Sequence, residues 1–212
     1  LNAIIGFTGT LLMELPGPLN PEQARQLRTV QQSGKHLITI INDLLDLAKI
    51  ESGAVQLSLE SIDAVQVVQS VMTSLQPLAD AKGLTLTGDI PDTSFMVYSD
   101  TRALGQILIN LVNNAIKFTD AGTVTVSLHR DYQGKRCITV SDTGPGIAPQ
   151  DLDRIFRAFE RGLVASAGQH EGTGLGLHIC QKLAELMRAR IVVDTSLEVG
   201  SSFSVVFDEE AI

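Results

Sequence analysis

A helical stripe of apolar residues between Pro21 and Ser52 constrains the fold more than any other feature of this sequence. Its members alternate steps of three and four positions, the spacing of a packed helical seam: Leu27, Val30, Gly34, Leu37, Ile41, Leu44 and Ala48. Asn20 is suited to cap this helix together with Gln23, and Gly53 is suited to end it. The stripe therefore predicts one long helix that packs against other helices.

A shorter stripe with the same spacing precedes this helix and runs from Leu1 to Leu15, after which Pro16-Gly17-Pro18 breaks it. The two stripes predict a helical hairpin over residues 1–53. Further apolar residues make the face of the second arm too wide for one hairpin to cover: Ile38, Ile40, Leu45 and Leu47. We expect a second copy of the chain to cover it in a dimeric four-helix bundle, unless the hairpin packs on the rest of its own chain.

Residues 54–212 have a different pattern, in which short strands alternate with helices. The predicted strands are Val55–Leu59, Leu84–Asp89, Phe95–Tyr98, Thr123–Arg130, Arg136–Ser141, Ile191–Thr195 and Ser202–Phe207. The predicted helices are Ile62–Lys82, Thr101–Phe118, Pro149–Phe156 and Thr173–Arg188. Because the strands come in runs between helices, we expect an α+β two-layer sandwich with a mixed sheet covered by helices on one face.

The composition excludes several classes of protein. Apolar residues make up 44% of the 212 residues and charged residues 19%, so a folded core is expected. The formal net charge of −8 disfavours a nucleic-acid-binding surface. No apolar run approaches the roughly 18 residues of a membrane helix, so we expect no membrane contact by these residues. The two cysteines, Cys137 and Cys180, have neither disulfide-framework nor metal-site spacing.

The predicted helix over residues 101–118 carries a polar stripe opposite a broad apolar side. The stripe consists of Gln106, Asn110, Asn113, Asn114 and Lys117. A helix this apolar should be mostly buried, and a buried amide without a partner costs roughly 1–3 kcal/mol. An asparagine carbonyl suits a hard cation such as Mg²⁺ and a lysine suits phosphate, so the stripe favours a polar ligand. A solvated helix face is the alternative.

Two glycine-rich segments follow this helix. Residues 142–147 (DTGPGI) come directly after a predicted strand, where the glycines permit tight turns and a carboxylate can accept a hydrogen bond from an exocyclic amine. Residues 172–177 (GTGLGL) open a predicted helix, whose N-terminal N–H groups suit phosphate. The residues between them, 158–171, are small and polar enough to form a mobile lid.

In this order the segments resemble the cytoplasmic core of bacterial sensor histidine kinases, over essentially the whole chain. Residues 110–118 (NLVNNAIKF) look like the family's asparagine box, and residues 142–147 look like its first glycine box. Residues 155–159 (IFRAF) look like its phenylalanine box, 172–177 like its second glycine box and 200–203 (GSSF) like its closing glycine motif. Residues 33–53 are similar to the second helix of its dimerisation and phosphotransfer hairpin. The resemblance implies a catalytic ATP-binding domain over residues 54–212.

The resemblance also implies roles for individual residues. Asn114 would ligate Mg²⁺, Asn110 would lie beside the ATP phosphates and Lys117 would contact them. Asp142 would read the adenine amino group. The remaining nucleotide contacts that it implies are Gly144, Gly146, Ile147, Phe159, Arg161, Gly172, Thr173, Gly174, Leu175, Gly176 and Leu177.

The reaction implied is transfer of the ATP γ-phosphoryl group to a histidine on the hairpin, then to an aspartate of a response-regulator receiver domain. The family's acceptor histidine lies upstream of Leu1, so we expect these residues to bind Mg-ATP and dimerise in the cytoplasm without phosphorylating themselves. Of the four histidines, we expect His36 to pack in the hairpin, His129 to lie on the surface, His170 to lie in the lid and His178 to pack near the site. Glu198 departs from the pattern, since many relatives have glycine there.

Two other functions are compatible with these motifs. A related ATPase of the gyrase, MutL or heat-shock chaperone type would share the nucleotide fold, but such enzymes use a carboxylate on the asparagine helix, and the stripe here carries no acid. A degenerate kinase that serves as a dimeric scaffold would retain the hairpin but would not bind nucleotide.

Overall fold

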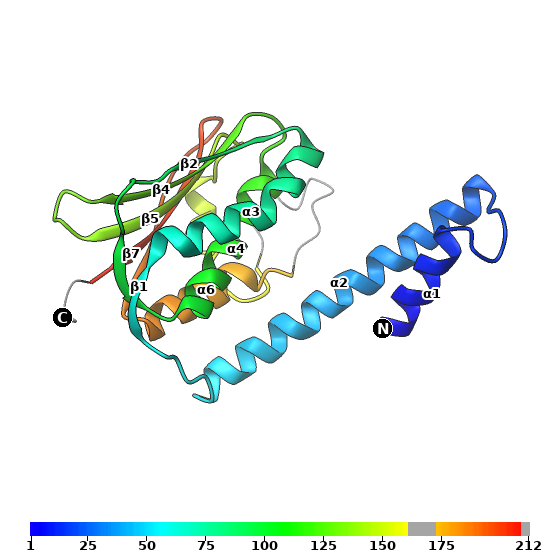
Figure 1. The fold of residues 1–212 in the computed structure, drawn as a ribbon, viewed down its shortest axis with the longest axis horizontal. Coiled ribbons are helices and arrows are strands. Elements are labelled where there is room, and N and C mark those ends of the chain that lie inside the picture. Colours follow the sequence, from blue (N-terminus) through cyan, green and yellow to red (C-terminus); the bar gives the residue numbers. More distant parts are fainter. Residues whose placement is uncertain (161–172, 209–212) are drawn as a thin grey trace.

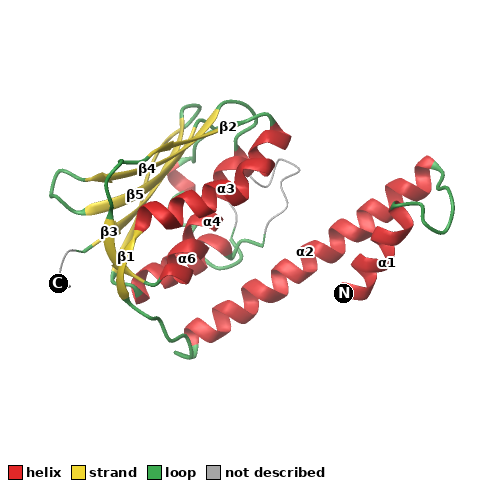
Figure 2. Cartoon of the chain, in the orientation of Figure 1, coloured by secondary structure: helices red, strands yellow, loops and turns green. Residues whose placement is uncertain are grey.

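A computed structural model describes residues 1–160 and 173–208, which form a helical hairpin followed by a two-layer sandwich of helices on a mixed sheet (Figures 1 and 2). This is the predicted fold class. The hairpin extends from the sandwich as a long arm, and its longer helix runs back toward the helical layer.

The hairpin consists of α1 (Asn2–Leu12) and α2 (Pro21–Glu51). The predicted capping box begins α2: the Gln23 N–H donates to Asn20 Oδ1 at 2.8 Å, and the Asn20 N–H donates to Gln23 Oε1 at 3.0 Å. Gly53, with a φ of 70°, follows the end of the helix as expected. Gly34 lies against α1, where a Cβ would meet the Ile5 side chain at 3.2 Å, so glycine allows the two helices to approach closely.

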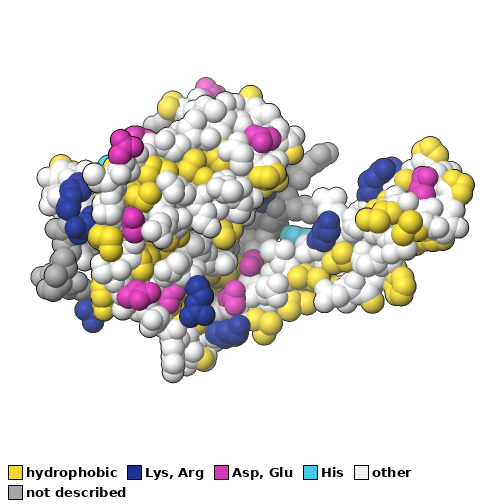
Figure 3. Space-filling view, viewed as in Figure 1, with side chains coloured by type: hydrophobic (Ala, Val, Ile, Leu, Met, Phe, Trp, Pro, Cys, Tyr) yellow, Lys and Arg dark blue, Asp and Glu magenta, His cyan; other side chains and the backbone are white. Residues whose placement is uncertain are grey.

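The apolar stripe of α2 is only partly covered by this chain. Leu47, near the end of α2, is buried against the core of the sandwich. Leu37, Ile41 and Leu44 stay between 42% and 49% exposed, and hydrophobic side chains are visible along the arm (Figure 3). Packing on the same chain therefore accounts for one end of the stripe and leaves its middle uncovered.

The sandwich contains a five-stranded sheet in the order β2-β4-β5-β7-β6, in which β2 and β4 are parallel and the other neighbours are antiparallel. The strands are β2 (Thr85–Asp89), β4 (Thr123–Arg130), β5 (Arg136–Asp142), β6 (Ala189–Ser196) and β7 (Gly200–Phe207). A separate antiparallel pair is formed by β1 (Glu60–Asp63) and β3 (Met96–Ser99). The helices α3 (Ala64–Lys82), α4 (Thr101–Phe118) and α6 (Gly176–Leu186) cover one face of the sheet.

The helix α4 forms the centre of the core. Its apolar side is fully or nearly fully buried, with Leu104, Ile107 and Val112 at 0% exposure. Asp100 caps its first turn by accepting from the N–H groups of Arg102 and Ala103. At the other end, the Lys82 ammonium donates to the main-chain carbonyl of Ile116 at 2.9 Å. Both ends of α4 are thus fixed, which holds its polar side in one position.

Several predicted elements differ from the structure in their bounds or in their type. Val55–Leu59 is not a strand, because β1 begins at Glu60 and the Ser58 N–H donates to the Asp100 carboxylate instead of to a neighbouring strand. The residues predicted as a helix over 149–156 form only a short 3-10 helix, η1 (Pro149–Asp151), followed by turns. The helix predicted to start at Thr173 starts at Gly176. Ahead of it Gly174 has a φ of 71°, which an α-helix does not allow.

Both cysteines are buried and unpaired, and burial raises the pKa of the Cys180 thiol to about 12. Glu198 lies in the turn between β6 and β7 with a φ of 62°, a conformation that favours glycine. Among the described helices, none is both long enough and apolar enough to cross a membrane.

Candidate functional site

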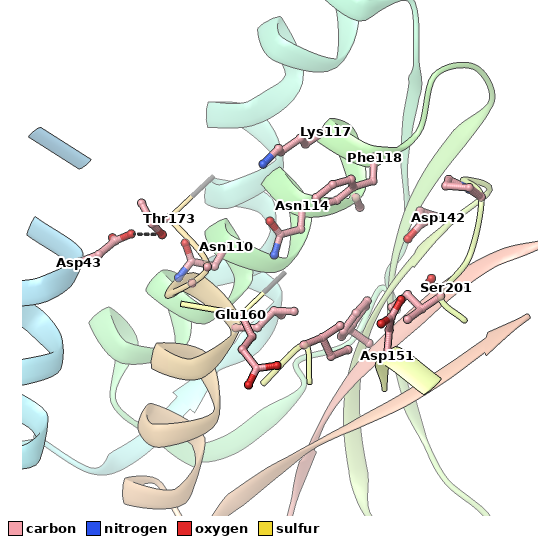
Figure 4. A pocket seen from close by; sticks show the side chains of 18 of the residues that line it. Asp43, Asn110, Asn114, Lys117, Phe118, Asp142, Asp151, Glu160, Thr173 and Ser201 are labelled. Carbon is pink, nitrogen blue, oxygen red and sulfur yellow. Dashed lines mark hydrogen bonds between the residues drawn. The ribbon is translucent and has the colours of Figure 1, made fainter. Parts of the chain in front are cut away.

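A cavity of about 520 Å³ lies between α4, the segment after β5, the start of α6 and one face of α2. Its size is that of a site for a small organic ligand. Figure 4 shows polar side chains from these elements converging on it, with the Asn110 and Thr173 side near α2 and Asp142 on the opposite side.

Three residues of the predicted polar stripe on α4 line the cavity: Asn110, Asn114 and Lys117. They recur at intervals of four and three positions, which places them on one side of the helix. The Lys117 ammonium lies 4.8 Å from the centre of the Phe118 ring, which also lines the cavity. Gln106 and Asn113 do not line it, so the stripe predicted from helical periodicity was wider than the site.

Asp142 ends β5 and forms the side of the cavity opposite α2. The Gly144 N–H donates to Asp142 Oδ1 at 2.8 Å. Burial raises the pKa of the Asp142 carboxyl, although the N–H groups of Gly144 and Ser201 oppose that shift. A partly desolvated carboxylate held in this way can accept a hydrogen bond from an amine on a ligand.

The first glycine-rich segment is shaped by close main-chain contacts. Gly146 has a φ of 70°, and a Cβ there would lie 2.1 Å from the Ser196 carbonyl oxygen. A Cβ at Gly144 would lie 2.8 Å from Asp142 Oδ1, so a side chain there would crowd the carboxylate. Ile147 lines the cavity, and its N–H donates to Thr195 Oγ1 at 2.9 Å. These glycines are therefore required by the packing beside the cavity.

The second glycine-rich segment forms the start of α6 and the side of the cavity near α2. Thr173, Gly174, Gly176 and Leu177 line the cavity, whereas Leu175 is fully buried beneath it. Gly176 lies against the Asn110 side chain, with its Cβ position 3.8 Å from Asn110 Cγ. The N–H groups in the first turn of α6 therefore lie next to the polar side of α4, an arrangement suited to an anion.

Comparisons with known proteins agree with this arrangement. Residues 99–211 match the family described as histidine kinase-, DNA gyrase B- and HSP90-like ATPase. Residues 1–53 match the family described as the His Kinase A phospho-acceptor domain. The chain belongs to the sensor histidine kinases.

Several relatives match this chain along nearly its whole length but are themselves longer. The chain is 41% identical to the histidine protein kinase DivJ of Caulobacter vibrioides, over 97% of this chain and 34% of that protein. It spans between 21% and 40% of the length of the curated relatives that it matches. The structure of full-length ShkA in complex with AMPPNP matches with a TM-score of 0.75 at 31% identity, over 97% of this chain and 43% of that one. The histidine kinase AdeS of Acinetobacter baumannii matches with a TM-score of 0.69 at 25% identity, over 99% and 95% of the two chains.

Not every residue predicted for the site lies at the cavity. Phe159 is 62% exposed and outside the cavity lining. Its main chain nevertheless contacts the second glycine segment, because the Phe159 N–H donates to the Gly174 carbonyl at 3.0 Å. Arg161, Gly172 and His170 lie outside the described residues, as does most of the predicted lid.

The lining of the cavity also contains residues that the sequence patterns did not indicate. Asp151, Glu160 and Ser201 belong to the part of the lining contributed by the sandwich. Helix α2 contributes a set spaced along one face: Gln32, Lys35, His36, Thr39 and Asp43. The spacing of these polar residues is a signal in the sequence, but the apolar stripe on the same helix is the stronger one. His36 was expected to pack in the hairpin and instead faces the cavity.

Proposed function

We propose that this chain is the ATP-binding kinase core of a two-component sensor histidine kinase, with residues 1–53 as the hairpin and 54–212 as the catalytic domain. It would transfer the γ-phosphoryl group of ATP to a hairpin histidine and then to a response-regulator aspartate. The observation that carries this proposal is the convergence of Asn110, Asn114 and Lys117 with the start of α6 at one end of the cavity, and of Asp142 at the other.

The cavity suits the two ends of ATP. At the adenine end, Asp142 would accept a hydrogen bond from the amino group of the base. Beside it, the Thr119 hydroxyl is fully buried and lacks a hydrogen-bond partner within the described part of the chain. The hydroxyl oxygen and Asp142 Oδ1 both lie within 3.2 Å of the Cβ position of Gly144, so the unsatisfied hydroxyl is close to the Asp142 carboxylate. At the other end, Lys117 and the first turn of α6 would hold the phosphates.

The donor set also suits Mg²⁺ held mainly by the nucleotide. No cluster of three His, Cys, Asp or Glu side chains occurs among residues 1–160 and 173–208. Mg²⁺ usually takes only one or two protein oxygens, with phosphates and water completing its shell, so the Asn114 carbonyl would be a sufficient protein ligand. When bound, the ion would neutralise charge on the phosphates.

The protein's contribution to phosphoryl transfer would be to position the groups and to stabilise charge. Asn110 and Asn114 would fix the phosphates against α4, and Lys117 would offset the negative charge that the transfer redistributes. The four carboxylates of the described lining, on Asp43, Asp142, Asp151 and Glu160, all lie outside α4. This disfavours the related ATPase alternative, which needs a carboxylate on the asparagine helix. The acceptor histidine in this proposal is none of the four in the chain.

The test is a titration with a fluorescent ATP analogue, with and without Mg²⁺, of the wild type, Asn114→Ala and Asn113→Ala. Asn113 is the matched control, because it neighbours Asn114 on α4 but does not line the cavity. We expect Asn114→Ala to lose about tenfold or more of the Mg²⁺-dependent affinity, while Asn113→Ala stays close to wild type. A wild type without Mg²⁺-dependent binding would favour the scaffold, and rapid steady-state ATP hydrolysis would favour the related ATPase.

A further inference from the structure

The wall of the cavity formed by α2 has no role in the function proposed so far. Gln32, Lys35, His36, Thr39 and Asp43 line the cavity together with Asn110, Asn114 and Lys117. These five residues, here called the α2 polar stripe, lie on the side of α2 opposite the apolar seam of Leu37, Ile41 and Leu44, as their helical spacing requires. One helix therefore presents one face to a bundle and the other to the cavity at the same time.

Direct contacts fix α2 in this position. The Thr173 hydroxyl donates to Asp43 Oδ2 at 2.8 Å and accepts from the Leu175 N–H at 3.1 Å (Figure 4). The Asp43 side chain is thus joined through Thr173 to the turn that begins α6. One turn further along α2, Leu47 is buried in the core of the sandwich. The α2 polar stripe is consequently a wall of the cavity, held in place by both polar and apolar contacts with the sandwich.

The α2 wall lies at the phosphate end. Asp43 meets Thr173 next to Asn110, and the Lys117 ammonium extends from α4 toward the same side, whereas Asp142 lies across the cavity (Figure 4). Figure 3 shows Lys or Arg and His side chains on α2 where the arm faces the sandwich. The Asp43–Thr173 contact therefore places α2 at the end of the cavity opposite Asp142, which is the end that the proposed function assigns to the phosphates.

Charge identifies which residue of the stripe would act. The described lining contains the carboxylates of Asp43, Asp142, Asp151 and Glu160, while its only ammonium groups are those of Lys35 and Lys117. A triphosphate adds three to four negative charges, so its binding requires cationic partners at the phosphate end. The ammonium group of Lys35 lies at the end of a long flexible side chain that can reach a phosphate, whereas the imidazole of His36 has a shorter reach. No ion pair joins Lys35 to another residue of the described chain.

We propose that Lys35 of α2 is a nucleotide-binding residue that contacts the terminal phosphates, so that the nucleotide bridges the hairpin and the catalytic domain. This inference rests on the proposed function, because it assigns Lys35 to the phosphate end of the same site. Its consequence is that nucleotide affinity depends on α2 staying docked, and that a nucleotide with fewer phosphates is less sensitive to α2.

The experiment measures the affinities of ATP, ADP and AMP by calorimetry for the full chain and for three variants, Lys35→Gln, Lys35→Arg and Lys49→Gln. Lys49 is the matched control, since it is an exposed lysine on α2 that pairs with Asp46 and does not line the cavity. We expect Lys35→Gln to weaken ATP binding by about three- to tenfold and AMP binding by less than about twofold. Lys35→Arg should keep most of the ATP affinity, and Lys49→Gln should match wild type.

The outcomes separate this inference from the proposed function. If Lys35→Gln binds ATP as wild type does while Asn114→Ala does not, the Lys35 role is overturned and the kinase core stands. If Lys35→Gln weakens the binding of ATP and of AMP equally, Lys35 maintains the structure of the cavity and does not contact the phosphates. This result also overturns the inference. If the wild type binds none of the three nucleotides, both proposals fall.

Discussion

At the scale of single residues, Asp142 lines the cavity but lowers the stability of the folded chain. Its carboxylate is partly buried at the end of β5, and burial raises its pKa because the charged form loses hydration. A group whose pKa is raised on folding destabilises the folded state once it is ionised. The contact with adenine that we propose for Asp142 would account for a carboxylate at this position.

We expect Asp142→Asn to raise the free energy of unfolding at pH 7 and to weaken ATP binding by about tenfold or more. Asparagine can still accept from the Gly144 N–H without carrying a buried charge, but its amide N–H₂ cannot accept from the adenine amino group. Urea unfolding and nucleotide titration measure the two effects.

The pH dependence of the free energy of unfolding tests whether burial of the Asp142 charge causes the stability difference. The cost of the Asp142 charge is present above its folded-state pKa and disappears below the unfolded value of about 3.9. The stability advantage of Asp142→Asn should therefore shrink as the pH is lowered from 7 toward 4. An advantage that grows on acidification would contradict burial of the charge as its origin.

At the scale of elements, the segment after β5 is tied to the turn between β6 and β7. The Glu198 N–H donates to the Pro145 carbonyl at 2.8 Å, and Gly146 packs directly on the Ser196 carbonyl. Strands far apart in sequence thus share one set of contacts beside Asp142. A substitution at Gly146 should therefore disturb both the cavity wall and the turn between β6 and β7.

The expected result is that Gly146→Ala destabilises the chain by roughly 2 kcal/mol more than Gly134→Ala does. Both glycines have a positive φ, 70° at Gly146 and 83° at Gly134, so both substitutions introduce a similar backbone strain. Only at Gly146 would the new Cβ collide with main chain, at 2.1 Å from the Ser196 carbonyl oxygen, whereas the space around Gly134 is open. Chemical denaturation of both variants compares them, and equal destabilisation would show that strain alone sets the cost.

At the scale of the whole molecule, α2 serves two surfaces. Its polar stripe faces the cavity of its own chain, and the middle of its apolar seam stays exposed. Because a monomer rarely leaves such a continuous apolar face in water, the seam favours association with a second copy into a four-helix bundle.

We expect the chain to be a dimer in solution and the double variant Leu37→Glu, Leu44→Glu to be a monomer, because two charges would be buried in the bundle. Light scattering after gel filtration gives the mass of each. Thr29→Glu is the control, since Thr29 is exposed on the side of α2 away from the seam and should leave the dimer intact. A monomeric wild type at about 50 µM would argue against the bundle.

The sequence by itself determined the elements whose pattern is local. The capping box at Asn20 and the bounds of α4 and β4 follow from short-range hydrogen bonding and periodicity, which adjacent residues encode. The resemblance to histidine kinases likewise rested on ordered local motifs, and the family and fold are confirmed. The element ends that were wrong, such as Val55–Leu59 and the start of α6, depend on distant partners such as Asp100 and on main-chain geometry at Gly174.

The tertiary structure alone decided which polar residues share the cavity. Periodicity placed Asn113 and Asn114 on one stripe, but only the packing of α4 on the sheet turns Asn114 into the cavity and leaves Asn113 out of its lining. The same applies to Asp43, whose contact with Thr173 joins residues 130 positions apart. Helical spacing fixes which side chains lie on the same face, whereas the element that the face meets is set by long-range packing, so the α2 polar stripe acquires its partner only in the folded chain.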